Sequence, residues 1–91
     1  MSTKAYLFWN TLQGEARQTE LTQEMTIIGR GHDCDISILD ERVSRQHVEI
    51  YFDGDAYLVS DLGSFNGTIL NGETLGDTRP LKDGDQLQIG P

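Results

Sequence analysis

Three short polar clusters hold the residue types with which this chain could bind an anion. They are Gly29-Arg30, Ser44-Arg45-Gln46-His47 and Gly63-Ser64-Phe65-Asn66-Gly67-Thr68. An arginine guanidinium presents a planar set of N–H donors that matches the oxygens of a phosphate or a carboxylate. A serine hydroxyl adds a neutral donor. If the chain brings these clusters together, they would form a site for one anionic group.

The first two clusters also have simpler interpretations when each is taken alone. Arg30 could pair at the surface with Asp33 or Asp35, and Ser44 could bond to the local backbone of an ordinary turn. His47 could be a general base, but a histidine that enters a strand is more often structural and donates to a backbone carbonyl. We therefore expect a structural role for His47.

The third cluster offers an amide and two hydroxyls in one loop. The Asn66 side chain can both donate to and accept from a peptide main chain, which suits peptide recognition. Ser64 and Thr68 could instead complete turns within the loop. Gly67 is expected to supply a backbone angle that other residues resist.

The elements that must position these clusters are expected to be strands. Val48, Ile50 and Phe52 alternate with polar residues, and such alternation places one face of a strand on a core. The dipeptides Asp53-Gly54 and Asn71-Gly72 are hairpin signals. The β-favouring runs are Ala5–Leu12, Met25–Ile28, Val48–Phe52, Ala56–Ser60 and Thr68–Leu70. We expect an all-β fold of many short strands, as in a sandwich.

Composition limits the classes of partner and the size of the fold. The chain has 91 residues, which suits a single domain over residues 1–91, alone or as a piece of a longer protein. Its 7 basic and 15 acidic residues give a net charge of −8, which disfavours nucleic acids and anionic membranes. Apolar runs are too short to span a bilayer. The single Cys34 favours a reducing compartment, so we expect a cytoplasmic protein.

The order and spacing of the motifs resemble the forkhead-associated (FHA) domain. Each motif alone is weak, but together they run from about Met25 to Gly90. The matching segments are Ile28-Gly29-Arg30, Cys34-Asp35-Ile36-Ser37-Ile38, Val43-Ser44-Arg45-Gln46-His47, Val59 to Thr68, Asn71-Gly72, Leu81 and Gly84-Asp85. The resemblance implies a sandwich of two antiparallel sheets whose loops at one end bind phosphothreonine peptides.

Site roles follow from the resemblance position by position. It implies that Arg30 and Ser44 bind the phosphate, with Arg45 as a further phosphate or peptide contact. Asn66 is implied to form a hydrogen bond with the peptide backbone. We assign Ser64 and Phe65, which precede it in the same loop, to the peptide-binding residues as well. The implied partner is a phosphothreonine-containing protein made by a Ser/Thr kinase.

Other residues are implied to support the loops: Gly29, His47, Asp61 and Gly67. The resemblance implies no enzyme activity, no cofactor and no metal.

Two departures from the family pattern stand out. Phe65 occupies a position where some members carry a threonine or serine that can touch the ligand, so a hydroxyl contact is lost there. The chain also stops at Gly90-Pro91, where family members continue into a final strand that pairs near the first. A missing final strand would leave an open edge at Tyr6–Trp9 and would invite a homodimer.

Three other readings compete with phosphopeptide binding. Ser44, His47 and Asp61 supply the residue types of a catalytic triad, but no Gly-x-Ser-x-Gly elbow accompanies them. The stretch from His32 to Asp35 is rich in metal-ligand types, as is the pair Asp53 and Asp55, without zinc or calcium spacing. The third alternative is a phosphate-independent interaction or oligomerisation module on the same fold.

Overall fold

The computed structural model describes residues 5–10, 14–21 and 24–89, and these contain strands but no helix. No segment among them is therefore a helix that could cross a membrane. The strands are β1 Tyr6–Asn10, β2 Ala16–Glu20, β3 Met25–Gly29, β4 Ile36–Ser37, β5 Val48–Phe52, β6 Tyr57–Asp61, β7 Thr68–Leu70, β8 Glu73–Thr74, β9 Arg79–Pro80 and β10 Leu87–Ile89. The expectation of an all-β chain is confirmed.

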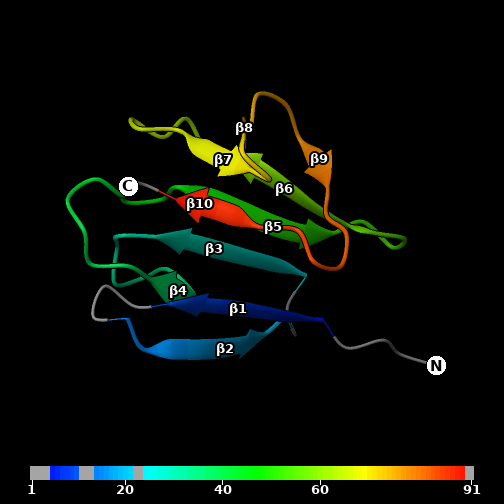
Figure 1. Cartoon of the computed structure of the whole chain (residues 1–91), viewed down its shortest axis with the longest axis horizontal. Coiled ribbons are helices and arrows are strands. Elements are labelled where there is room, and N and C mark those ends of the chain that lie inside the picture. The colour runs from blue at the N-terminus through cyan, green and yellow to red at the C-terminus, as the bar shows by residue number, and fades with distance from the viewer. Residues whose placement is uncertain (1–4, 11–13, 22–23, 90–91) are drawn as a thin grey trace.

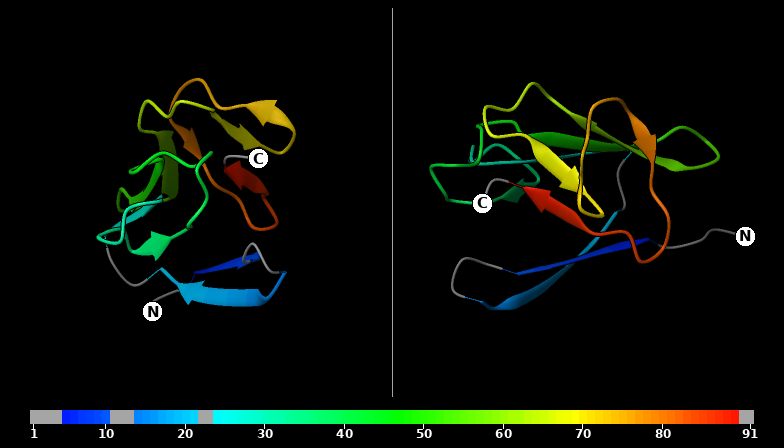
Figure 2. Two further views of the ribbon diagram at one scale, coloured as in Figure 1. Left: turned by 90° about the vertical axis from the view of Figure 1, so that its left-hand side faces the viewer. Right: turned by 45° about the horizontal axis from the view of Figure 1, so that its top comes forward.

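The strands form three sheets that enclose one core. The largest sheet has the order β4-β3-β5-β6-β9, the second has the order β10-β7-β8, and β1 pairs with β2 (Figure 1). An end-on view shows the five-stranded sheet on one side and the two smaller sheets around the other (Figure 2). The arrangement is the sandwich that the sequence predicted.

Alternating burial explains why these residues form strands. In β5, Val48 and Ile50 are almost fully buried, whereas Glu49 and Tyr51 are only partly buried. Phe52, which the alternation predicted on the same buried face, is instead 43 % exposed at the end of the strand. Ile50 lies opposite Val59 of β6, and this pair sits at the centre of the core. The remaining buried core members are Leu21, Ile28, Ile36, Val48, Leu70 and Leu75.

The two predicted hairpins are confirmed. β5 and β6 pair antiparallel across Asp53-Gly54, and β7 and β8 pair antiparallel across Asn71-Gly72. One pairing departs from a purely antiparallel sandwich, because the short β4 runs parallel to β3. In the sequence, β4 lies between the first polar cluster and the second.

Six strands of the described part of the chain lie at sheet edges, namely β1, β2, β4, β8, β9 and β10, and two of these bear on the expected open edge. There, β1 pairs only with β2, and β10 pairs only with β7. Gly90-Pro91, where the sequence stops, lies outside the described residues.

Candidate functional site

The first two polar clusters meet at the loop end of the five-stranded sheet. The backbone N–H of Arg30 donates to the Ser44 carbonyl at 2.9 Å, and that of Gly31 donates to the Arg45 carbonyl at 3.0 Å. Gly29 makes this close approach possible, because a Cβ at this position would overlap the backbone of Arg45. The two arginine-bearing segments are thus held against each other by backbone contacts.

Arg30 and Arg45 keep their charges available for a ligand. Among the described residues, neither has an acidic partner within ion-pair distance. The Arg30 Nε donates to the Val43 carbonyl at 3.0 Å, which fixes the side chain and leaves both terminal nitrogens for an anion. The surface pairing with Asp33 or Asp35 that the sequence allowed is therefore absent from this part of the chain.

The positive charge of Arg42, on the loop between β4 and β5 that also carries Arg45, is already paired with an acidic side chain. Its guanidinium forms two hydrogen bonds to the Asp40 carboxylate, at 3.0 and 2.8 Å. The hydrogen bonds from the side chain and the backbone of Arg42 lower the pKa of Asp40 to about 2. The unpaired positive charge of these two loops is thus concentrated at Arg30 and Arg45.

The hydroxyl of Ser44 is oriented by the third cluster. The backbone N–H of Phe65 donates to Ser44 Oγ at 3.0 Å. A hydroxyl that accepts at its oxygen still has its own proton to donate. Ser44 can therefore offer a neutral donor to an anion while it links the two loops.

His47 is fully buried behind these loops. Its Nδ1 accepts from the Ser44 backbone N–H at 3.0 Å, and its Nε2 lies 2.8 Å from the Gly67 carbonyl. A carbonyl can only accept, so Nε2 carries the proton and the imidazole is the neutral tautomer. The ring joins the second cluster to the third, in the structural role expected for it.

Asp61 organises the third cluster from within. Its carboxylate accepts from the Ser64 backbone N–H at 2.7 Å and from the hydroxyls of Ser64 and Thr68 at 2.6 Å each. Partial burial favours a higher pKa for Asp61, but these hydrogen bonds outweigh it and hold the pKa below its usual range. The Ser64 hydroxyl also accepts from the Gly67 N–H at 2.9 Å. It is engaged inside the loop, which is the turn-forming alternative considered for Ser64.

Two neighbouring side chains of this loop behave differently. The Asn66 Nδ2 donates to the Arg42 carbonyl at 2.7 Å, leaving one N–H and the side-chain carbonyl of this exposed amide for other partners. Phe65 is 93 % exposed and makes no aromatic contact within the described chain. The loop therefore exposes the Asn66 amide and the Phe65 ring, and the Phe65 backbone contacts Ser44.

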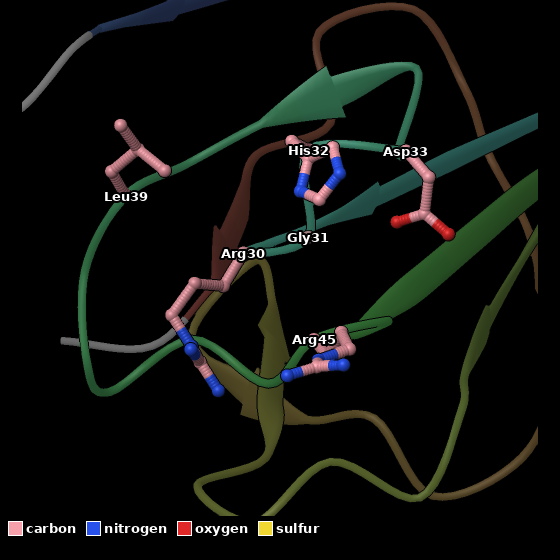
Figure 3. Close-up of a pocket in the computed structure, with 6 residues that line it drawn as sticks. All are labelled: Arg30, Gly31, His32, Asp33, Leu39 and Arg45. Carbon is pink, nitrogen blue, oxygen red and sulfur yellow. The ribbon is translucent and has the colours of Figure 1, made fainter.

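A hollow of about 310 Å³ opens beside the two free arginines (Figure 3). Arg30 and Arg45 line it, and their guanidinium groups face the same space. Leu39 lines the hollow on the opposite side of the view from His32 and Asp33. Sequence reasoning did not select Leu39 or His32 as part of an anion site, since nothing in their local pattern places them beside the arginines.

The residues of the triad and metal alternatives are engaged in other contacts. His47 contacts the backbone of Ser44 and not its hydroxyl, and Asp61 binds Ser64 and Thr68, so no proton relay is assembled. Asp35 accepts from the Ile27 N–H. Within the described ranges, no group of three or more histidine, cysteine or acidic side chains is placed to hold a metal ion.

The fold and the site together define a β sandwich with an anion-binding loop cluster at one end. The FHA domain profile matches residues 26–90. The chain belongs to the FHA domain family.

Curated relatives share up to about half of their length with this chain. It is 40% identical over 77 residues to the FHA domain-containing protein FhaA of Mycobacterium tuberculosis, covering 85% of this chain and 14% of FhaA. It is 47% identical over 70 residues to the oxoglutarate dehydrogenase inhibitor of Corynebacterium jeikeium, covering 77% and 48%.

A solved structure shares the fold closely. It comes from a structural and functional analysis of phosphothreonine-dependent FHA domain interactions, and it superposes with a TM-score of 0.81 at 36% identity. The match covers 94% of this chain and 88% of that chain.

Proposed function

We propose that this chain is a non-catalytic module that binds phosphothreonine in partner proteins. Arg30, Ser44 and Arg45 bind the phosphate, and Asn66 bonds the peptide main chain. The observation that carries the proposal is that Arg30 and Arg45 have no acidic partner within ion-pair distance among the described residues, while the hydroxyl of Ser44, next to Arg45 in the chain, accepts from Phe65 and keeps its own proton to donate. Membership of the FHA family supports the same reading.

The energetics suit this role. A phosphothreonine carries about −1.5 to −2 charges at neutral pH and three acceptor oxygens. Hydrogen bonds to charged groups contribute about 1.5–3 kcal/mol each. Three such bonds, from Arg30, Arg45 and Ser44, therefore supply a large part of the roughly 8 kcal/mol that micromolar binding requires.

Specificity for a peptide, over free phosphate, comes from the third cluster. The Asn66 amide keeps one N–H and one carbonyl for a peptide main chain while its other N–H holds the Arg42 carbonyl. Its position is therefore set before a ligand arrives, which lowers the ordering cost of binding. Ser64, engaged with Asp61, contributes by shaping the loop.

The charge distribution of the chain indicates which classes of partner it binds. A net charge of −8 repels nucleic acids and anionic membranes, so the arginine-bearing end is the attractive spot for a phosphorylated protein. We propose a partner phosphorylated by a Ser/Thr kinase and a cytoplasmic setting, where the free Cys34 thiol stays reduced. Recruitment of signalling or regulatory partners is the expected outcome.

A second candidate function is phosphate-independent association through the sheet edges. It is favoured by the unpaired edges of β1 and β10 in the described part of the chain. Such edges can pair with another strand, including that of a second copy. This association would not use the arginines, so the two functions can be separated by mutation.

The deciding experiment is titration calorimetry with matched threonine and phosphothreonine peptides, selected from an oriented library. The proposal expects micromolar binding of the phosphorylated peptide alone. Binding of both forms with equal affinity would instead favour the edge-mediated function. Sedimentation of the free chain would then test for a homodimer.

A further inference from the structure

Two large apolar side chains stand exposed beside the candidate phosphate site. Phe65 is 93 % exposed and Leu39 is 75 % exposed, and only Phe8, on β1, is comparable among the exposed large hydrophobic residues of the described chain. Single exposed apolar residues are common on protein surfaces. Their placement on two loops of one charged site is the informative feature.

The backbone holds Leu39 outward. The preceding residue, Ile38, donates its N–H to the Gly29 carbonyl at 2.8 Å and packs against the core. The following residue, Asp40, donates its N–H to the Ile38 carbonyl and is bound by Arg42. Leu39 is fixed between these anchors and lines the hollow that contains Arg30.

Phe65 is held outward in the same manner from the other loop. Its N–H is bound to Ser44 Oγ, and the side chains on either side of it are tied to Asp61 and to the Arg42 carbonyl. Phe65 is not among the residues that line the hollow. The Phe65 backbone therefore contacts Ser44, whereas Leu39 lies at the hollow, so the two apolar residues hold different positions.

We propose that Leu39 and Phe65 select phosphothreonine peptides with large apolar side chains near the phosphothreonine, each apolar residue at a separate peptide position. This inference rests on the proposed phosphothreonine binding. A peptide bound as proposed contacts both side chains, because Leu39 lines the hollow with Arg30 and Arg45, while Phe65 precedes Asn66 and bonds Ser44 Oγ through its backbone N–H. Apolar contacts around a charge-assisted bond also exclude water from it, which strengthens the bond.

The test is a positional peptide library built around a fixed phosphothreonine and probed with four proteins. These are the wild-type chain, Leu39→Ala, Phe65→Ala and the control Phe8→Ala. Phe8 is 76 % exposed and lies on β1 between Leu7 and Trp9, which pack on the core. Its removal deletes a comparable exposed side chain outside the three loops.

We expect the wild-type chain and Phe8→Ala to prefer large apolar over polar residues at two flanking positions by about tenfold each. Tenfold corresponds to about 1.4 kcal/mol. Phe65→Ala should abolish the preference at one position, and Leu39→Ala at the other. Binding of the best peptide should also shift the NMR signals of the Leu39 methyl groups and the Phe65 ring.

Three results would overturn the inference, and the first two are distinguishable from the third. If the wild-type chain binds phosphothreonine peptides without an apolar preference, or if both alanine variants keep it, the selection by Leu39 and Phe65 is refuted while the proposed function stands. If the wild-type chain binds phosphorylated and unphosphorylated peptides equally, the proposed function fails and the inference fails with it.

Discussion

Replacement of His47 by alanine should destabilise the fold strongly, because the imidazole joins two of the three clusters. Its ring is fully buried and bonds both the Ser44 N–H and the Gly67 carbonyl. Removal leaves the Ser44 N–H and the Gly67 carbonyl, both partly buried, without these partners, at about 1–3 kcal/mol each. The expected loss in the free energy of unfolding is therefore about 2–6 kcal/mol, before any cost of the cavity.

Urea denaturation followed by Trp9 fluorescence measures this loss. His47→Gln is the matched control, since its side-chain amide keeps a donor that can reach the Gly67 carbonyl. It should recover part of the stability that His47→Ala loses. A typical domain is stable by only about 5–15 kcal/mol, so the denaturation of the alanine variant is measured at low temperature, where its folded state is still populated.

A loss of unfolding free energy below about 0.5 kcal/mol for His47→Ala would contradict this prediction, since neither the bond to the Ser44 N–H nor the bond to the Gly67 carbonyl would then contribute to stability. An equal loss of unfolding free energy in His47→Gln and His47→Ala would show that the hydrogen bond to the Gly67 carbonyl does not contribute to stability.

Three further predictions test other parts of the site. Arg30→Ala should weaken phosphothreonine-peptide binding at least tenfold in calorimetry with little change in Tm, whereas Arg79→Ala, which removes an equal charge paired with Glu73, should not. Gly29→Ala should lower the unfolding free energy by about 1–3 kcal/mol because its Cβ meets the Arg45 backbone, while Gly76→Ala, with open space around it, should change little. The pKa of Asp61 is lowered in the folded chain, so its stabilising contribution is present above its unfolded pKa of about 3.9 and is lost as pH falls through the folded pKa. Acid titration of stability should therefore be less steep below about pH 4 in Asp61→Asn; identical curves for the two proteins would contradict this.

The strands could be predicted from local sequence because their signals are local. The alternation at Val48 and Ile50 and the two hairpin dipeptides each act within a few residues, and the structure confirms them. Phe52 was wrongly predicted on the buried face, because it ends the strand and is 43 % exposed. The parallel contact of β4 with β3 could not be predicted in this way, because it joins two segments through a loop whose path depends on the core.

The site was predictable in its residues but not in its contacts. Arg30, Ser44 and Asn66 were selected from residue type and from the family resemblance, and the structure places them on adjoining loops. The neutralisation of Arg42 by Asp40 depends on a turn geometry that residue spacing does not specify. Leu39 was missed because it follows an alternating strand-like run and gives no polar signal.

The central claim is that phosphate on a threonine is what this chain recognises. Its most direct test is calorimetric titration of the wild-type chain and Ser44→Ala with one library-selected peptide in phosphorylated and unphosphorylated form. We expect micromolar binding of the phosphorylated peptide to the wild-type chain, weaker binding to Ser44→Ala, and no measurable binding of the unphosphorylated peptide. Equal affinity of the wild-type chain for the two peptides would contradict it.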